Sequence, residues 1–277
     1  MIPRRPNLDF RSIPIRWAKN EEFSVDLNAG SPIASQSEPY LNTVMGKMRA
    51  SLPADRLELR RDIEVFIKQE TNHYKVHNDF NRHLYESGYE KIRAIEMELR
   101  DDFRRLLKEK SLTFNAAYCA GFENLALFLC KYIFFKAQSY FEGGHPVMVD
   151  LFMWHYAEEF EHRTVAHDAY AAMYGNYFHR VHGAIYSFFH LAGYKSRIRK
   201  AILEIDRATM TAEEAEASRR RITELDRKLS LYVLPRMLAV LIPYYNPRRT
   251  KLPRIVQEAL DKYASGEVPD NAAIASS

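Results

Sequence analysis

Two copies of a Glu-x-x-His motif are the residues of this chain whose types and spacing best suit chemistry. The first pairs Glu70 with His73, and the second pairs Glu159 with His162. Residues three apart on an α-helix project from the same side, so each pair can hold one metal ion. The two motifs therefore predict two metal ions bound between neighbouring helices.

A lone glutamate, Glu123, lies between the two motifs in an otherwise apolar segment. It is the only acidic residue between Lys110 and Glu142. A buried carboxylate without a partner is costly and normally takes up a proton, and a metal ion removes that cost. The residues that share its side of a helix are small or apolar: Ala116, Cys119, Ala120, Leu127 and Cys130. Glu123 is therefore a third predicted ligand contribution.

The two Glu-x-x-His faces are also apolar above and below the polar residues. One face reads Ile63, Phe66, Glu70, His73, His77, Phe80, and the other reads Phe152, His155, Glu159, His162, Ala166, Ala169. A solvated charged face would not be bracketed by apolar side chains in this way. Both faces are expected to point into the core.

This order of residues matches the ferritin-like pattern of one Glu from each of two helices and Glu-x-x-His from each of the other two. The pattern requires one more Glu before residue 70, and Glu38 is the best candidate. Pro39 disfavours helical geometry at position 38, which would place Glu38 at the very end of its helix. The alternatives fit less well, because they lie on the Glu70 helix or in an irregular arm: Glu58, Glu64, Glu21 and Glu22.

The elements that must position these residues are long helices. Only 10 Gly and 12 Pro occur in 277 residues, and no segment alternates as a strand would. The sequence predicts an all-α, ferritin-like four-helix bundle core with additional C-terminal helices. Residues 1–35 are expected to form an irregular arm, 36–265 a single helical domain with its ligand helices within about 36–174, and 266–277 a flexible tail. Helices are expected over 39–50, 54–87, 89–109, 113–141, 146–174, 177–206, 211–241 and 252–264.

The segments FIKQETNHYKVHNDFN and WHYAEEFEHRTVAHDAY resemble the bacterial family of predicted metal-dependent hydrolases. Its pattern is QExxHxxxH, then a lone Glu, then WHxxEExEHxxVAxD, and the resemblance covers about residues 36–200. In the family the early Glu follows Pro-x-Gly, whereas this chain has Ser37-Glu38-Pro39. The resemblance implies a hydrolase whose metal ions activate water.

At motif level the chain also resembles the di-iron N-oxygenases that convert arylamines to nitro compounds. Their last ligand helix carries His-x-x-x-Glu-x-x-His, which His155, Glu159 and His162 reproduce. This resemblance implies a site of seven ligands: Glu38, Glu70, His73, Glu123, His155, Glu159 and His162.

Further polar residues near the motifs are candidates for a supporting shell. His77 lies one turn beyond His73, and the choices are a residue that hydrogen-bonds a ligand, an eighth ligand or a core histidine, with the first favoured. Arg163 and Asp168 are expected to brace the ligands, although each would serve equally as an ordinary salt bridge. Glu158 and Glu161 are expected to support the ligands from behind or to lie on the surface, because their helix face differs from that of the ligands.

A Glu-rich site with two or three His suits iron, or manganese, better than Cu(I) or structural zinc. The predicted function is a di-iron oxygenase or oxidase that uses O2 and an electron donor to oxidise a small organic substrate, with an amine as one option. The alternatives are a two-metal hydrolase and a metal-binding helical protein without catalysis.

Charge, cysteine spacing and hydropathy argue against several other classes of protein. The net charge is +4 and no basic stripe is interleaved with aromatics, so a nucleic-acid partner is not expected. Cys119 and Cys130 would lie roughly 16 Å apart on one helix, too far for a disulfide, and the start has no apolar signal segment. A cytoplasmic location is expected, and a homodimer stays open.

Residues 229–245 are apolar, but Arg236 and two prolines argue against a membrane span, so a core helix is favoured over a peripheral membrane helix.

Overall fold

The structure is a computed structural model that describes residues 1–264, and every regular element in that range is a helix. The elements are α1 (Glu21–Ser51), α2 (Leu57–Leu84), η1 (Tyr85–Tyr89), α3 (Ile92–Glu109), α4 (Leu112–Lys136), α5 (Gln138–Phe141), α6 (Pro146–His162), α7 (Val165–Met173), α8 (Tyr177–Arg207), α9 (Ala212–Val240), η2 (Pro247–Arg249) and α10 (Arg254–Ala264). The all-α class is confirmed. The predicted tail, 266–277, lies outside the described residues.

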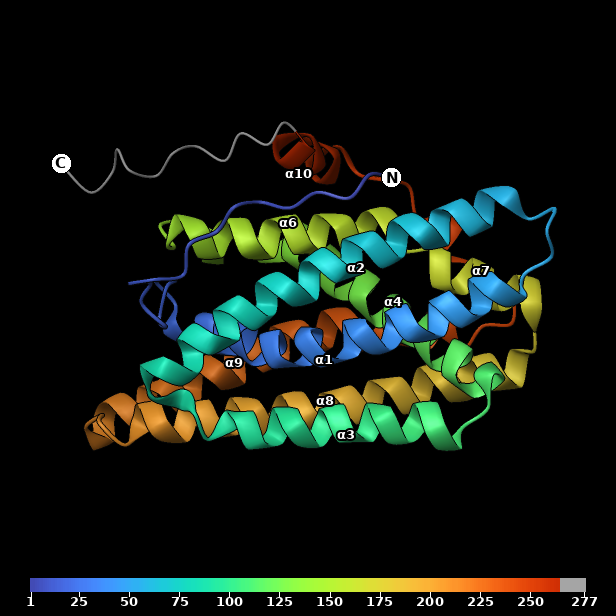
Figure 1. Cartoon of the computed structure of the whole chain (residues 1–277). Coiled ribbons are helices and arrows are strands. Elements are labelled where there is room, and N and C mark those ends of the chain that lie inside the picture. Colours follow the sequence, from blue (N-terminus) through green and yellow to red (C-terminus); the bar gives the residue numbers. More distant parts are fainter. Residues whose placement is uncertain (265–277) are drawn as a thin grey trace.

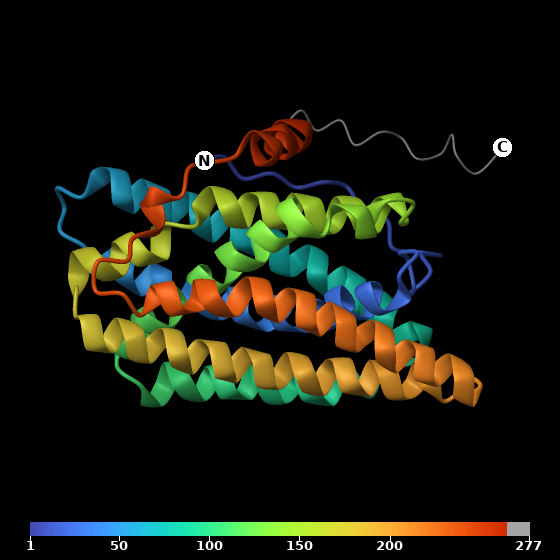
Figure 2. The same ribbon diagram turned by 180° about the vertical axis from the view of Figure 1, so that it is seen from behind.

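The long helices lie side by side as a bundle (Figure 1). The N-terminal segment and α10 cross over α6 on one side, while α3 and α8 run along the opposite side. Seen from behind, α9 lies next to α8 across the near face (Figure 2). Helices α1, α2, α4 and α6 thus lie between α10 with the N-terminal segment on one side and α3 with α8 on the other.

Helix α1 begins at Glu21, so the expectations of an irregular arm to residue 35 and a helix start near residue 39 are wrong. The Asn20 side chain accepts a hydrogen bond from the Phe23 N–H and caps the first turn. The helix then continues through Pro32 and Pro39. Each proline removes a backbone hydrogen bond, but α1 is buried along most of its length, and this packing outweighs the local penalty.

The expected helix over 146–174 is divided into α6 and α7. Helix α6 ends at His162, and α7 begins at Val165. Arg163 Nη1 donates to the carbonyl of Phe160 at 2.7 Å, which a continuous helix would offer to the N–H of Thr164. The break changes the direction of the chain directly after the last ligand candidate, and α7 remains packed in the bundle, with Ala166 and Ala169 fully buried.

Helix α4 is long and apolar enough to cross a membrane, but 72% of its most apolar window is buried inside the protein. It crosses α8 very closely. A Cβ on Gly121 would lie 2.5 Å from Ala184 Cα, and one on Gly183 would lie 2.4 Å from the Ala117 carbonyl carbon. Only glycine allows this approach, so α4 is a core helix pressed against α8.

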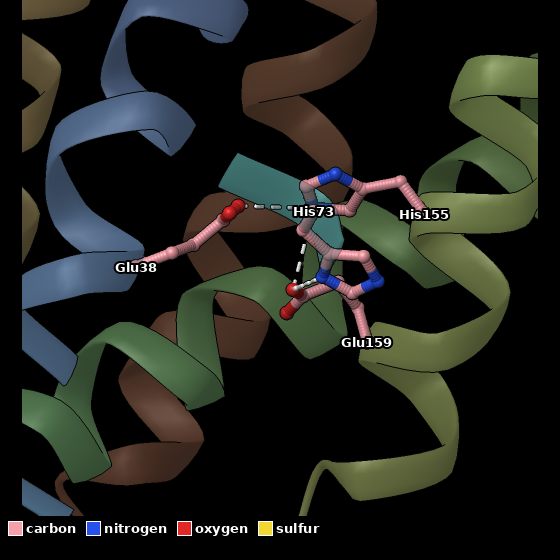
Figure 3. Close-up of side chains that lie close together, drawn as sticks. All are labelled: Glu38, His73, His155 and Glu159. Atoms are coloured by element: carbon pink, nitrogen blue, oxygen red, sulfur yellow. Dashed lines mark ion pairs between the residues drawn. The ribbon is translucent and has the colours of Figure 1, made fainter. Parts of the chain in front are cut away.

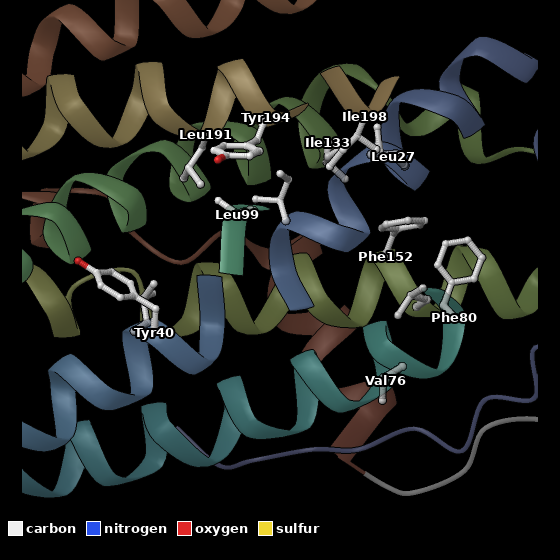
Figure 4. Close-up of a cluster of buried hydrophobic side chains, with 14 of the residues drawn as sticks. Leu27, Tyr40, Val76, Phe80, Leu99, Ile133, Phe152, Leu191, Tyr194 and Ile198 are labelled. Carbon is white, nitrogen blue, oxygen red and sulfur yellow. The ribbon is translucent and has the colours of Figure 1, made fainter. Parts of the chain in front are cut away.

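Apolar side chains from α1, α2, α3, α4, α6 and α8 interdigitate beside the polar interior (Figure 4). The labelled members are Leu27, Tyr40, Val76, Phe80, Leu99, Ile133, Phe152, Leu191, Tyr194 and Ile198. All of these except Tyr194 are less than 9% exposed. This packing fixes the helices that carry the candidate ligands. The thiols of Cys119 and Cys130 are free and buried.

Candidate metal centre

The structure brings all seven predicted ligands together in the buried interior of the bundle. Helix α1 supplies Glu38, α2 supplies Glu70 and His73, α4 supplies Glu123, and α6 supplies His155, Glu159 and His162. His155, at 9%, is the most exposed of the seven. Their donor atoms form two groups, each within 4.8 Å, that share Glu159: Glu38, His73, His155, Glu159, and Glu70, Glu123, Glu159, His162.

In the first group the side chains of three helices converge on one point (Figure 3). His155 Nε2 lies 3.7 Å from Glu38 Oε1 and 3.3 Å from Glu159 Oε1. His73 Nδ1 lies 3.6 Å from the same Glu159 oxygen. Glu38 is in the middle of α1 rather than at its end, so it reaches this group from the side of the helix.

In the second group one histidine nitrogen faces three carboxylates. His162 Nε2 lies 3.1 Å from Glu70 Oε1, 3.5 Å from Glu123 Oε2 and 3.4 Å from Glu159 Oε2. Glu159 therefore directs one oxygen to each group, which is the arrangement expected of a bridging carboxylate.

Many of these donor atoms are buried without a hydrogen-bond partner among the described residues. The partnerless atoms include both carboxylate oxygens of Glu70, Glu123 and Glu159, Oε2 of Glu38, Nδ1 of His73 and Nε2 of His162. Buried polar atoms are almost always paired, because an unpaired one costs about 1–3 kcal/mol. Oxygen and imidazole donors aimed at two common points fit two metal ions.

The pKa shifts of the four glutamates also indicate that the site lacks positive charge. Burial, followed by the charge of Glu70, raises the pKa of Glu38 well above its ordinary value. Burial, followed by the charge of Glu159, likewise raises the pKa of Glu70 and of Glu123. Burial would raise the pKa of Glu159 as well, but His162 and His155 hold it well below the ordinary range. A bound cation would relieve this repulsion.

His73 is held from behind by an ion-pair network that includes the N-terminal arm, residues 1–20, which precedes α1. Its Nε2 shares a hydrogen bond of 3.0 Å with Glu158 Oε2, so its Nδ1 is the nitrogen that faces the first group. Arg4 Nη1 donates to Glu158 Oε1 at 3.1 Å and to Glu161 Oε2 at 2.9 Å. Glu158 lies in the supporting shell, and nothing in the sequence pattern pointed to Arg4.

His162 has a separate support. Its Nδ1 lies 3.2 Å from Gln69 Oε1, and Gln69 Nε2 donates to Glu161 Oε2 at 2.7 Å. Sequence reasoning did not assign Gln69 a role, although it directly precedes Glu70 in the quoted QExxH motif. Its place in that motif is the sequence feature that could have identified Gln69 as a partner of the ligands.

His77 lies behind His155. The two rings share a hydrogen bond of 2.6 Å between His77 Nε2 and His155 Nδ1, which leaves His155 Nε2 facing the carboxylates. His77 Nδ1 lies 2.8 Å from Ser31 Oγ, which donates to Asn81 Oδ1. Burial and the neighbouring His155 lower the pKa of His77 well below its usual value, so it is neutral. This chain of contacts sets the orientation of the His155 ring.

Arg163 and Asp168 do not brace the ligands as predicted. Arg163 donates to the backbone carbonyls of Phe160 and Thr250, and Asp168 pairs with Arg248. Both follow the end of α6 at His162, and the break there turns them toward the segment after α9.

A cavity of about 260 Å³ lies beside the first group. Three predicted ligands line it, namely Glu38, His155 and Glu159, whereas the other four do not. Most of the remaining wall is apolar and comes from α1, α4, α6, α8 and α9, including Ile33, Phe122, Leu129, Phe152, Leu191 and Val233. The first group is thus open to a small molecule, and the second is enclosed by protein.

A family model described as a predicted metal-dependent hydrolase matches residues 2–251. The match includes all seven candidate ligands and extends to Arg4 in the N-terminal arm. No curated protein and no solved structure matches the chain.

Proposed function

The chain belongs to the family of predicted metal-dependent hydrolases, and on that premise we propose that it binds two metal ions and hydrolyses a substrate with an apolar group. One observation carries the proposal. Buried, partnerless carboxylate and imidazole atoms form two groups that share Glu159, and one of the groups borders an apolar cavity.

Each residue has a defined task in this proposal. Glu38, His73 and His155 would hold an ion beside the cavity, Glu70, Glu123 and His162 would hold an enclosed ion, and Glu159 would contribute one oxygen to each. The donor set is hard and rich in oxygen, which suits iron or manganese. Because Glu158, Gln69 and His77 orient the histidines from behind, the donor nitrogens are already directed inward before binding.

The bound ions would lower the pKa of a water molecule and polarise the bond under attack. The apolar wall of the cavity would bind the apolar part of the substrate and exclude bulk water. Glu38 Oε2 is partnerless, and Glu38 lines the cavity, so this oxygen is placed to accept the proton that the attacking water gives up.

A second candidate, O2-dependent oxidation of an apolar substrate with an external electron donor, is favoured by the polarity of the cavity. A hydrolase usually offers hydrogen-bond donors to the developing oxyanion. Here the cationic group in the wall, Lys195, is already paired with Asp26 at 2.8 Å, and Ser37 Oγ donates to its own helix at Ile33. The remaining hydroxyl donors of a mostly apolar wall are those of Tyr156 and Ser230. The Glu and His donor set on four helices is also that of di-iron carboxylate proteins.

One experiment separates the two reactions. The metal-free protein is loaded without oxygen with Fe(II), Mn(II) or Zn(II), and its metal content is measured. Aryl esters of increasing acyl length are then supplied, first without oxygen and afterwards with O2 and a reductant. Glu159→Gln serves as the metal-deficient control.

Two metal ions per chain and ester cleavage without oxygen are expected. Product formation only with O2 and reductant, together with a transient visible absorption band, would favour the oxidase. Failure to bind any metal would overturn both reactions.

A further inference from the structure

Helices α8 and α9 expose large apolar side chains that lie side by side on one surface of the protein. Figure 2 shows the two helices as neighbours across the near face. We define the apolar face by seven residues, each 43–77% exposed: Phe178, Ile185, Phe189, Leu231, Leu234, Leu238 and Ile242. Most large apolar residues exposed in the described part of the chain lie on these helices or directly after α9.

Spacing and contacts make this a single surface. On each helix the exposed apolar residues recur every three, four or seven positions, which is one side of a helix. The helices are joined near one end, where the Tyr177 hydroxyl donates to the Leu241 carbonyl at 2.7 Å and Arg180 donates to the Val240 carbonyl. The sequence-based expectation that 229–245 is a core helix is therefore wrong for the side that carries Leu231, Leu234 and Leu238.

The cavity beside the metal centre opens on this face. Leu234 is 48% exposed and also lines the cavity, as do the exposed residues Ala192 and Ser230. Glu38 and His155 lie on the same cavity wall deeper in the bundle. An apolar molecule that arrives at the α8–α9 surface thus has a route to the candidate metal centre.

The charge of the surrounding segments is one-sided. Residues 177–203 and 229–257 together contain ten Lys and Arg and no Asp or Glu, in a chain whose net charge is +4. Six of these cations are paired with acids, and Arg180 is buried against backbone carbonyls; the paired ones are Lys195, Arg197, Arg199, Lys200, Arg248 and Arg254. Among the described residues, the ion pairs give no acidic partner to Arg236 in α9 or to Arg249 and Lys251, which are exposed just after α9. The border of the apolar face is therefore cationic at the end of α9.

These features distinguish between the surfaces that could cover the face. In a two-fold dimer the same patch meets itself, so cationic borders would face each other and the cavity mouth would be closed. A tightly packed protein partner would close the mouth as well. An anionic lipid surface complements the charge, accepts the apolar side chains and leaves the mouth open to mobile acyl chains.

We propose that the α8–α9 apolar face docks on an anionic membrane surface and that the cavity takes a lipid-soluble substrate directly from it. The association is peripheral, since α4, the candidate span among the described helices, is mostly buried in the core. The docking stands independently of the reaction, whereas the delivery of substrate rests on the proposed function.

The test is flotation of the full-length protein with vesicles of phosphatidylcholine, with or without a third of phosphatidylglycerol. The wild-type protein is expected to float with the anionic vesicles and to bind roughly tenfold more weakly without phosphatidylglycerol or at high salt. The double variant Leu231→Ser/Leu238→Ser, which changes residues outside the cavity lining, is expected to lose at least about tenfold in affinity.

The matched control is Leu57→Ser, which removes a leucine that is 71% exposed at the start of α2, outside the apolar face. It should bind vesicles as the wild type does. Thermal unfolding and metal content of both variants verify that the fold is intact. Because no activity is measured, a failure of the proposed hydrolysis does not affect this outcome.

Light scattering in solution completes the test. If the wild-type protein does not bind vesicles, the proposal is overturned. If it is then also a dimer that Leu231→Ser/Leu238→Ser converts to a monomer, the face is a subunit interface. Unchanged vesicle binding by the double variant would overturn the proposal too. Equal binding to vesicles without anionic lipid would refute the electrostatic part.

Discussion

Glu158 Oε2 lies 3.0 Å from His73 Nε2, so the second nitrogen of this ring, Nδ1, is the one directed at Glu159. The contact determines which nitrogen is available to a metal ion. Glu158 is completely buried and is itself held by Arg4. The N-terminal arm therefore acts on the centre through two successive side chains.

This relationship predicts that Glu158→Gln lowers metal affinity about 10- to 100-fold without removing a ligand, because the ring of His73 loses its anionic partner. The measurement is a competition titration against a chromophoric chelator. Glu64→Gln is the control, since Glu64 is exposed on the same helix as His73 and pairs only with Arg49 and Lys68 in the contacts seen. Equal affinities in the two variants would refute the orienting role of Glu158.

Loss of Glu159, the carboxylate that both groups share, should remove more metal than loss of Glu123, which belongs to one group. Glu159→Gln is expected to reduce the metal content from about two ions per chain to less than one, because both groups lose a donor. Glu123→Gln should leave about one ion, bound by the group beside the cavity. Elemental analysis measures both.

Glu123→Gln should fold, because glutamine resembles the protonated carboxylic acid that burial favours at Glu123. Glu159 is ionised beside His155 and His162, so thermal unfolding of Glu159→Gln has to verify that its fold is intact. If Glu123→Gln removed both ions and Glu159→Gln removed one, the assignment of the shared ligand would be wrong.

The pKa values predict that metal binding releases protons and strengthens as the pH rises. The pKa values of Glu38, Glu70 and Glu123 lie above their ordinary value, mainly because of burial. Their protonation stabilises the metal-free fold below the ordinary Glu range, and this stabilisation is lost as pH rises through the folded-state pKa values. A metal ion must displace these protons.

Calorimetric titration with Mn(II) in buffers of different ionisation enthalpy measures the released protons. Affinity is expected to increase as the pH rises above the ordinary Glu range. Glu123→Gln should release fewer protons than the wild type. Proton uptake on binding would contradict the electrostatic description of the centre.

Two glycines of α8 should respond to alanine in opposite directions. A Cβ at position 183 would meet backbone of α4 at 2.4 Å, whereas one at Gly193 would meet nothing within 4 Å. Gly183→Ala should destabilise the protein by about 1–3 kcal/mol through overpacking. Gly193→Ala should stabilise it by about 0.5–1 kcal/mol through helix propensity.

Chemical denaturation measures both changes. Destabilisation at Gly183 should be accompanied by weaker metal binding, because α4 carries Glu123. Similar stability of the two variants would show that α4 and α8 are not pressed together as described.

The residues that lie together at the centre could be predicted because helical periodicity is a local property. Spacing alone placed Glu70 beside His73 and Glu159 beside His162, and an acidic residue isolated in an apolar helix identified Glu123. The structure brings these residues into contact because each apolar helix face must be buried against another. The positions of the apolar residues along each helix are enough to show which face must be buried.

Other features depended on contacts between distant segments. Packing holds α1 helical through Pro39 and places Glu38 in mid-helix, and Arg4 reaches Glu158 across 154 positions. The break after His162 turned Arg163 away from the ligands. Which side of α9 is buried was also undecidable locally, because an apolar helix can be covered all round or on one side. Only the tertiary structure decided these points, since each results from what packs against a segment rather than from its own residues.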